Sequence, residues 1–450
     1  MLALLLWAAL LVPAPRDWVP MRWPWTEAES LKRIDGTPVN CLLLESWTPE
    51  FAAAAARRGL VLMAVARPET GAGEAARRAS AAGLHGVVLE GGFPPDAASL
   101  VRKAAPDLAV VELSARIRMP LGGDAPVVGT WQGVWPGVQV LAGGVAKAAP
   151  TGSPWIETNS GFLRAARAVT EAAIWIGNLP PANTVIKGDR YLQAMADAAL
   201  AGGRWILALD PDFAGRLGGG EAAALRDWQR IASLAAFFES HKEFRALRPA
   251  GRLAVVQSAE AGALLSGGIL DMIGARHTPV RAIPPSRLAP EALAGAAIAI
   301  NVEPDALTPA QREVLRGFAR GGGTVLTPAP GPPVRPGERM TLTPAELDRL
   351  GDIFRDVQSL IGRRNLGVRL FNVASMLSYL GAAPGGQIYL HLVNYSGYPV
   401  ENVAVHLLGK FKRARLIAPE GERDLETYAL DEGTGVDISK VSVWATLRLD

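Results

Sequence analysis

Acidic side chains stand at the ends of several short apolar runs in the first half of the chain. Glu157 closes the run PWIE, Glu45 closes NCLLLE, and Glu90 follows HGVVL. An acid beside apolar residues is costly to bury unless it is paired, hydrogen-bonded or open to water, so a series of them at strand ends indicates a wet cleft. The acids in such positions are Glu45, Glu90, Glu112, Glu157, Asp210 and Asp212.

Two carboxylates that converge from different strands can hydrolyse a glycosidic bond. One protonates the leaving oxygen, and the other acts as the nucleophile or activates water. We take Glu157 as the first candidate for the catalytic acid or base, and Glu112 and Glu90 as the further catalytic candidates. The sequence thus favours a glycoside hydrolase that acts on a carbohydrate substrate.

Polar and aromatic side chains near the same strand ends are candidates for binding a sugar. Aromatic faces stack on the C–H surface of a sugar ring, and the glycine-rich segment GVWPGVQVLAGG would place Trp135 over the cleft. The Arg116 guanidinium matches the geometry of a carboxylate on an acidic sugar. The predicted substrate-binding residues are Glu45, Trp131, Gln132, Trp135, Arg116, Asn159, Asn178 and Asp210.

These residues also have structural interpretations. Glu45 and Glu90 could cap the helices that follow or pair with an arginine of a neighbouring loop. Glu112 lies inside its run with Arg116 close in sequence, and Asp210 precedes a proline, as a residue that begins a turn does. Tryptophans on strands belong to the core more often than to a binding surface.

Repeated βα units are expected to position these side chains. Between residues 40 and 210, β-rich runs alternate with helical stretches such as PEFAAAAARRG and DRYLQAMADAALAGG. Eight near-continuously apolar runs favour a closed (β/α)8 TIM barrel, with an open doubly wound sheet as the alternative. The predicted strands are 40–45, 60–66, 85–91, 108–114, 126–132, 154–159, 173–178 and 204–210.

The second half of the chain predicts two further folding units. Runs at 252–258 and 296–303, with a helix at TPAQREVLRGFARGG, indicate a flavodoxin-like α/β domain. Alternating strands such as GQIYLHLVNYSG indicate a small C-terminal β-sandwich. The predicted division is 1–16 signal peptide, 17–248 barrel, 249–335 α/β domain, and 336–450 linker and β-sandwich.

This domain order resembles that of the three-domain bacterial β-galactosidases and their glycoside-hydrolase relatives. The segments LTPAQREVLRGFARGGGTVL (307–326) and LHLVNYSGYPVENVAVHLLG (390–409) carry the likeness together with the barrel runs. The resemblance implies an Asn-Glu pair after strand four, the Glu being the acid/base, and a nucleophilic Glu after strand seven. The segments found here, VVELSAR and AIWIGN, do not match this pattern.

Two consequences follow from that mismatch. Other barrel glycosidases use acids from strands four and six, an arrangement that would fit Glu112 and Glu157. The alternative function is a catalytically inactive pseudo-glycosidase that binds carbohydrate, in which the catalytic pair has been lost.

The predicted middle domain also resembles class I glutamine amidotransferase domains. Their chemistry needs a cysteine nucleophile at a strand-to-helix turn and a histidine to activate it. Residues 251–330 contain no cysteine, the turn reads VVQSAEAG, and His277 is the only histidine. We therefore expect a non-catalytic packing domain through which a homo-oligomer could form.

Composition limits the remaining functions. The net charge of +3 is small for 450 residues, and no basic stripe is interleaved with aromatics, so nucleic acid is not an expected partner. The single cysteine excludes an internal disulfide and a cysteine-based metal cluster, and the histidines lack metal-ligand spacing. We expect neither a metal nor a cofactor.

The N-terminus indicates export. The apolar run from Leu2 to Val12, followed by small residues and prolines, is too short to span a bilayer and resembles a secretory signal. Later runs do not reach transmembrane length, so the mature chain should contain no integral membrane span and should be secreted or periplasmic.

Overall fold

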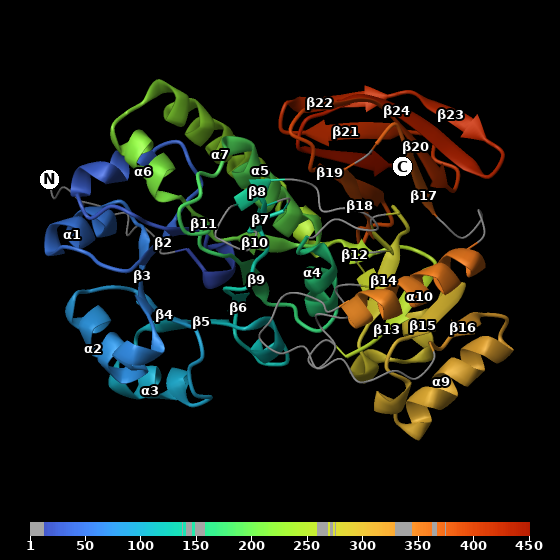
Figure 1. Ribbon diagram of the computed structural model, residues 1–450, viewed down its shortest axis with the longest axis horizontal. Coiled ribbons are helices and arrows are strands. Elements are labelled where there is room, and N and C mark those ends of the chain that lie inside the picture. Colours follow the sequence, from blue (N-terminus) through green and yellow to red (C-terminus); the bar gives the residue numbers. More distant parts are fainter. Residues whose placement is uncertain are drawn as a thin grey trace, which may run out of the picture.

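The computed structural model describes residues 13–136, 138–140, 146–148, 158–258, 269–270, 273–274, 276–328, 344–361, 367–373 and 375–450. The first half forms a barrel of parallel strands, coloured from blue to green in Figure 1. These are β1 (Pro20–Arg22), β2 (Cys41–Leu44), β3 (Val61–Ala66), β4 (Gly86–Glu90), β5 (Ala109–Ser114), β6 (Val127–Thr130), β9 (Ala173–Ile176), β10 (Gly203–Trp205) and β11 (Leu207–Ala208).

The last strand closes the barrel by pairing with two neighbours in turn. Its first half, β10, pairs with β9 through Arg204 and Trp175, and its second half, β11, pairs with β1 through Leu207 and Met21. Between the two halves, the backbone N–H of Ile206 donates to a carbonyl of β9 at 2.8 Å. Counting β10 and β11 as one strand gives eight parallel strands, and the predicted (β/α)8 barrel is confirmed.

The order of the strands corrects the count made from the sequence. The first strand is β1, which was not predicted, and β6 pairs directly with β9, Gly129 lying opposite Trp175. The predicted strand at 154–159 therefore has no place in the sheet between β6 and β9; residues 154–157 lie outside the described residues. Because β1 is the first strand of the barrel, β4 is the fourth, and Glu90, not Glu112, ends strand four.

Side chains alternate between the barrel interior and the helix layer, as the pleat of a strand requires. The interior contains, among others, Cys41, Leu43, Val61, Met63, Val88, Val111, Leu113, Val127 and Trp175. Burial raises the pKa of the Cys41 thiol, so this cysteine is an inert core residue. The outer face packs against α1 (Pro49–Arg57), α2 (Ala72–Ala81), α3 (Ala97–Ala104), α4 (Ser160–Arg167), α5 (Gly188–Leu200), α6 (Pro211–Gly218) and α7 (Ala222–Ser240).

The middle unit, yellow in Figure 1 except for the orange helix α10 (Pro344–Leu360), is a parallel sheet with helices. Its strand order β14-β13-β15-β16 is that of flavodoxin-like folds. Apolar side chains are buried on both faces of the sheet, which explains the near-continuous apolar runs in the sequence. Its elements are β13 (Leu253–Val256), β14 (Val280–Ile283), β15 (Ile298–Asn301), α9 (Pro309–Arg320), β16 (Thr324–Leu326) and α10 (Pro344–Leu360).

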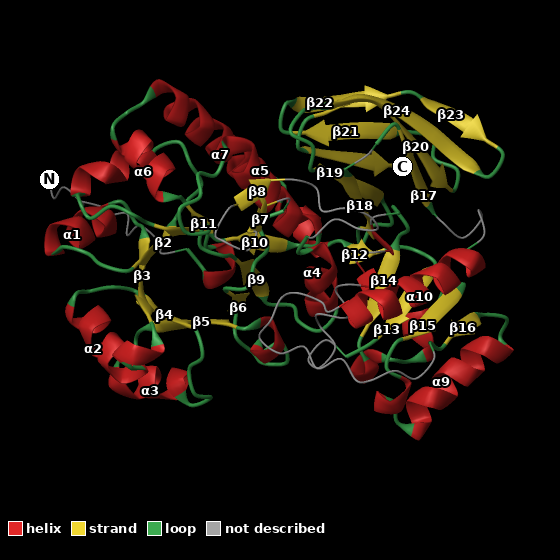
Figure 2. Cartoon of the chain, viewed as in Figure 1, coloured by secondary structure: helices red, strands yellow, loops and turns green. Residues whose placement is uncertain are grey.

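The C-terminal part consists of two antiparallel sheets, whose strands are drawn in yellow in Figure 2. The first sheet has β12 (Arg248–Pro249), β18 (Met376–Ala382), β19 (Ile388–Asn394), β25 (Trp444–Leu449), β21 (Ala414–Ala418) and β22 (Gly421–Leu425). The second has β17 (Val368–Phe371), β20 (Val400–Leu408), β24 (Gly433–Val441) and β23 (Thr427–Leu430). Their facing side chains form one apolar cluster.

Polar contacts join this β-sandwich to the barrel. The Arg164 guanidinium of α4 donates to the carbonyl of Ser378 at 2.8 Å, and the Gln193 amide of α5 donates to the carbonyl of Ser396 at 2.9 Å. Within the described residues, helices that combine the length and the apolar character needed to cross a bilayer are not found. Residues 1–12 of the predicted signal peptide, 1–16, lie outside those residues.

Candidate active site at the barrel mouth

Four charged side chains point from the strand ends into the mouth of the barrel. Cys41 and Leu43 of β2 face the interior, so alternation directs Glu45 inward as well; Val88 of β4 does the same for Glu90. Arg22 at the end of β1 and Arg67 just after β3 complete the set. The carboxyl ends of the strands are the edge at which (β/α)8 barrels carry their active sites.

Arg22 connects the two acids of this cluster. Its Nη2 lies 2.6 Å from Glu90 Oε1, and its Nη1 lies 3.2 Å from Glu45 Oε1. Arg67 reaches the same pair from the other side, with Nη2 at 2.9 Å from Glu45 Oε1 and Nη1 at 3.6 Å from Glu90 Oε2. The alternative sequence-based interpretation, in which Glu45 and Glu90 pair with arginines, therefore describes contacts that the structure contains.

Burial distinguishes the two acids. The Glu90 side chain is 6% exposed and that of Arg22 is 11% exposed, whereas the Glu45 side chain is 53% exposed. Glu90 Oε2 is buried and accepts no hydrogen bond from a described residue, although Arg67 lies nearby. Glu90 Oε2 thus has an ion pair with Arg67 but no hydrogen bond among the described residues, and a carboxylate oxygen without a hydrogen bond is what a general acid or a nucleophile would need.

A pocket of about 210 Å³ opens beside this cluster. Glu45 and Arg67 line one part of it, and Trp47 lines another. The Arg78 guanidinium lies over the Trp47 ring, 5.8 Å from its centroid. The pocket therefore combines two carboxylates, Glu45 and Glu69, with cations and an aromatic side chain, the mixture that holds polar ligands with apolar faces. Trp47 is not one of the substrate-binding residues predicted from the sequence.

Glu112 faces away from the mouth. Its neighbours Val111 and Leu113 lie in the barrel interior, so alternation directs Glu112 toward the helix layer, where it is partly exposed. Because β5 carries apolar residues on both faces, the sequence did not indicate which face Glu112 is on. The structure therefore does not bring Glu112 together with Glu45 and Glu90.

Glu157 lies outside the described residues, in the connection between β6 and α4. Asn159, two residues further along the chain, belongs to a buried polar network. Asn159 Oδ1 accepts from Arg116 Nη2 at 2.7 Å and from the backbone N–H of Val134 at 2.7 Å. Gln132 accepts from the backbone N–H of Arg116 at 2.8 Å. The predicted sugar ligands Arg116, Gln132 and Asn159 thus bind one another in the described part of the chain.

Asp197 extends this network to the β-sandwich and was not predicted from the sequence. Its Oδ2 accepts from the Asn159 side chain at 2.7 Å, and its Oδ1 accepts from the Tyr395 hydroxyl at 2.6 Å. Complete burial raises the pKa of Asp197 to about 6, and the hydrogen bonds from Tyr395 and Asn159 limit the rise. In the sequence, an aspartate in this alanine-rich helix is expected to face solvent. The β-sandwich, which packs against α5, buries it.

The other predicted residues have mainly structural partners. Asp210 caps α6, accepting from the backbone N–H of Phe213 at 3.0 Å, and also accepts from the Tyr191 hydroxyl at 2.7 Å. Trp135 is buried, its ring packing edge-on against Tyr191 and Trp205, so it does not form an exposed platform over the mouth. This packing corrects the expected position of Trp135.

Two predicted residues remain close to strand ends on the mouth side. Trp131 is partly exposed, and its indole N–H has no hydrogen-bond partner among the described residues. Asn178 is exposed and donates to the carbonyl of Gly133 at 2.9 Å. In the described ranges, groups of three or more His, Cys, Asp or Glu side chains that could hold a metal ion do not occur.

Comparison with known proteins places the fold among glycosidase structures. No protein-family model matches the sequence, and no curated protein matches it. The α-L-fucosidase isoenzyme 2 from Paenibacillus thiaminolyticus is similar with a TM-score of 0.65, 10% identity, and coverage of 97% of this chain and 99% of that one.

Two β-galactosidase structures are similar over nearly their whole length as well. Gan42B, a GH42 β-galactosidase from G. stearothermophilus, gives a TM-score of 0.54 at 9% identity and covers 96% of this chain and 98% of its own. The β-galactosidase from Rahnella sp. R3 gives 0.51 at 9% identity, with 92% and 95% covered. The chain therefore shares with these structures a barrel fold with further α/β and β parts.

Proposed function

We propose that the protein is an exported glycoside hydrolase, with Glu90 as one catalytic carboxylate. The observation that carries this proposal is the position of Glu90, buried at the end of strand four, directed into the mouth and with one oxygen free of hydrogen bonds. In the resembled galactosidases the acid/base follows strand four. Here the preceding residue is Leu89 instead of asparagine.

Glu157 is the proposed second carboxylate. It belongs to the connection that follows strand six, so Glu90 and Glu157 would supply acids from strands four and six. Two acids on opposite sides of a scissile bond are what either stereochemical course of glycoside hydrolysis requires. Glu45 and Trp47 are proposed to bind the sugar in the pocket beside Arg67.

The test is turnover of aryl glycosides by the purified full chain. The panel includes aryl α-L-fucoside and β-D-galactoside, because proteins of similar fold are named for those activities. We expect Glu90→Gln and Glu157→Gln each to lower kcat by about 10²- to 10⁴-fold, the contribution typical of a general acid or base. Trp47→Ala should raise KM with less effect on kcat.

Glu313→Gln is the matched control, because Glu313 is an exposed acid on α9 of the middle unit, paired with Arg316 at 2.9 Å. It should leave turnover unchanged. Turnover that survives Glu90→Gln at the wild-type rate would contradict the role given to Glu90. An inactive Glu90→Gln variant must also show the wild-type far-UV circular dichroism spectrum, so that misfolding is excluded.

A carbohydrate-binding protein without turnover is the second candidate. Two observations favour it: Glu45 and Glu90 are both paired with arginines, and strand seven ends in Ile176 followed by Gly177 and Asn178, with no carboxylate. Tight binding of a saccharide by calorimetry, without turnover of any member of the panel, would support this candidate over the enzyme.

A further inference from the structure

Five arginines line a cavity far from the barrel mouth. The cavity has a volume of about 480 Å³ and lies where the barrel, the middle sheet and the β-sandwich meet. Arg167 and Glu171 stand at the connection that enters β9 from its N-terminal end, which is the end opposite the mouth. Its cationic lining residues are Arg167, Arg245, Arg248, Arg281 and Arg287.

Three of the arginines, Arg167, Arg281 and Arg287, donate to backbone carbonyls, which do not neutralise their charge. Arg167 donates to the carbonyls of Ala172 at 2.8 Å and Gly202 at 2.7 Å. Arg287 donates to the carbonyl of Val169 at 2.8 Å, which ties the middle unit to the barrel. Carbonyl oxygens orient a guanidinium without neutralising it.

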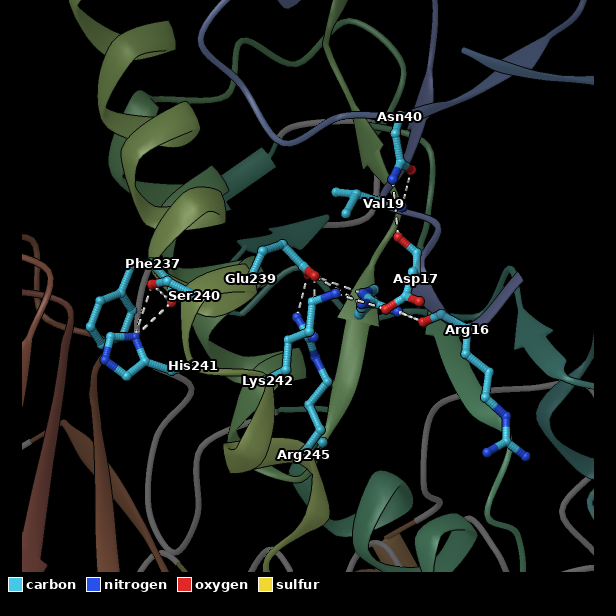
Figure 3. Close-up of polar contacts among 12 residues, drawn as sticks. Arg16, Asp17, Val19, Asn40, Phe237, Glu239, Ser240, His241, Lys242 and Arg245 are labelled. Carbon is cyan, nitrogen blue, oxygen red and sulfur yellow. Dashed lines mark hydrogen bonds and ion pairs between the residues drawn. The ribbon is translucent and has the colours of Figure 1, made fainter. Parts of the chain in front are cut away.

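Acidic side chains near the cavity are fewer than the arginines. Glu171 is the acid in its lining. Glu239 pairs with Arg245, as Figure 3 shows, but it also pairs with Arg204 at 3.0 Å and is therefore shared between two cations. Arg248 is exposed, and its side chain makes no hydrogen bond or ion pair with another described residue. A net positive charge of several units thus surrounds one cavity.

Two nitrogen donors of Arg281, which lines this cavity, have no hydrogen-bond partner in the described ranges. Its Nη1 donates to the carbonyl of Ala294 at 3.1 Å, while Nε and Nη2 are buried without a hydrogen-bond partner in the described ranges. Burial lowers the pKa of Arg281 from its ordinary value, and it does the same for Arg167. The charges of these two guanidinium groups are thus poorly compensated, and a bound anion would offset the free-energy cost of burying them.

We propose that this cavity binds a small organic polyanion bearing phosphate or carboxylate groups. Guanidinium groups recognise both groups through paired, charge-assisted hydrogen bonds, and the volume lies within the range of small-molecule sites. The apolar part of the lining, which includes Leu247, Ile283, Pro284 and Pro384, would contact the body of the ligand. Because the ligand would touch three parts of the chain, its binding would stabilise their arrangement.

Calorimetric titration of the full chain tests the site, with inorganic pyrophosphate and citrate as separate probes and sodium chloride at matched ionic strength as the salt control. We expect saturable binding of at least one probe and a higher thermal midpoint in its presence. Stronger binding of pyrophosphate would indicate a phosphorylated ligand, and stronger binding of citrate a carboxylated one; either supports the site. Sodium chloride should reproduce neither effect.

The variants Arg281→Ala and Arg248→Ala should each weaken binding about 10-fold or more, since a hydrogen bond to a charged group changes a binding constant by that factor. Arg248 is exposed, so its variant should fold even if Arg281→Ala does not. Arg102→Ala, on an exposed position of α3, removes the same charge elsewhere and should bind normally. Absence of saturable binding by both probes, or binding that Arg248→Ala and Arg281→Ala leave unchanged, would overturn the proposal.

Discussion

Arg22 places its two terminal nitrogens against two different carboxylates, Nη2 at 2.6 Å from Glu90 and Nη1 at 3.2 Å from Glu45. The guanidinium at the end of the three-residue strand β1 thereby holds together the acid that follows β2 and the acid that ends β4. Since Arg22 and Glu90 are nearly excluded from solvent, each depends on the other for compensation of its charge.

Loss of Arg22 should destabilise the protein more than loss of the pair. Arg22→Met leaves the buried Glu90 carboxylate without its main partner, and we expect a loss of about 3–5 kcal/mol in the free energy of unfolding. The double variant Arg22→Met/Glu90→Gln should recover part of that loss, because no uncompensated charge remains. Denaturant unfolding of the four proteins of this cycle measures the coupling. Simply additive effects would show that the two side chains do not compensate each other.

The hydroxyl of Tyr395 should matter most when Asp197 is charged. Asp197 has a pKa of about 6 against an ordinary value of 3.8, so this group contributes stability below about pH 4 that is lost as the pH rises through about 6. The Tyr395 hydrogen bond opposes the shift. Tyr395→Phe should therefore cost about 1–3 kcal/mol of unfolding free energy at pH 8 and less at pH 5.

Tyr398→Phe provides the matched control for this variant. Tyr398 lies in the same turn and is 66% exposed, so loss of its hydroxyl should change stability little at either pH. Urea unfolding of both variants at pH 5 and pH 8 makes the comparison. A cost of Tyr395→Phe that is the same at both values would contradict the linkage to Asp197.

His391 should make the protein less stable in acid. It is fully buried in the β-sandwich, with Nδ1 at 2.8 Å from Thr446 Oγ1. Burial, assisted by the nearby Arg164, lowers its pKa to about 3 from 6.5. As the pH falls from about 6.5 toward 3, His391 becomes protonated in the unfolded chain but stays neutral in the folded chain. This group therefore lowers the free energy of unfolding by about 1.4 kcal/mol per pH unit.

His391→Gln removes that titration. The difference in unfolding free energy between the wild type and the variant should therefore shrink between pH 6 and pH 4, at the slope given above. Denaturant unfolding at several pH values within this interval measures it. A difference that stays constant over the interval would mean that His391 does not resist protonation in the folded state.

Local patterns were sufficient for most elements of the barrel. The helix at PEFAAAAARRG appears as α1, and its N-terminus is capped by Thr48, whose hydroxyl accepts from the N–H of Phe51 at 3.1 Å. The runs at 60–66 and 108–114 appear as β3 and β5. The strand Pro20–Arg22 was missed because three residues with a proline carry no measurable period.

The candidate site was harder to predict than the fold. Glu90 and Glu45 were named from their place after apolar runs, and they do meet at the mouth. The inward direction of a side chain was not readable in β5, because a strand buried on both faces has no polar side to mark its pleat. For the same reason Glu112 was placed at the mouth, although it faces the helices.

The sequence by itself determined the barrel class, the acids at its strand ends and the β-rich C-terminal part, since these depend on composition and short-range periodicity. Only the tertiary structure decided which strand is the first, that one arginine holds both mouth acids, that Asp197 meets Tyr395 nearly two hundred positions later, and that five arginines surround one cavity. Such contacts arise from chain closure and from packing between distant segments. No window along the chain contains both partners.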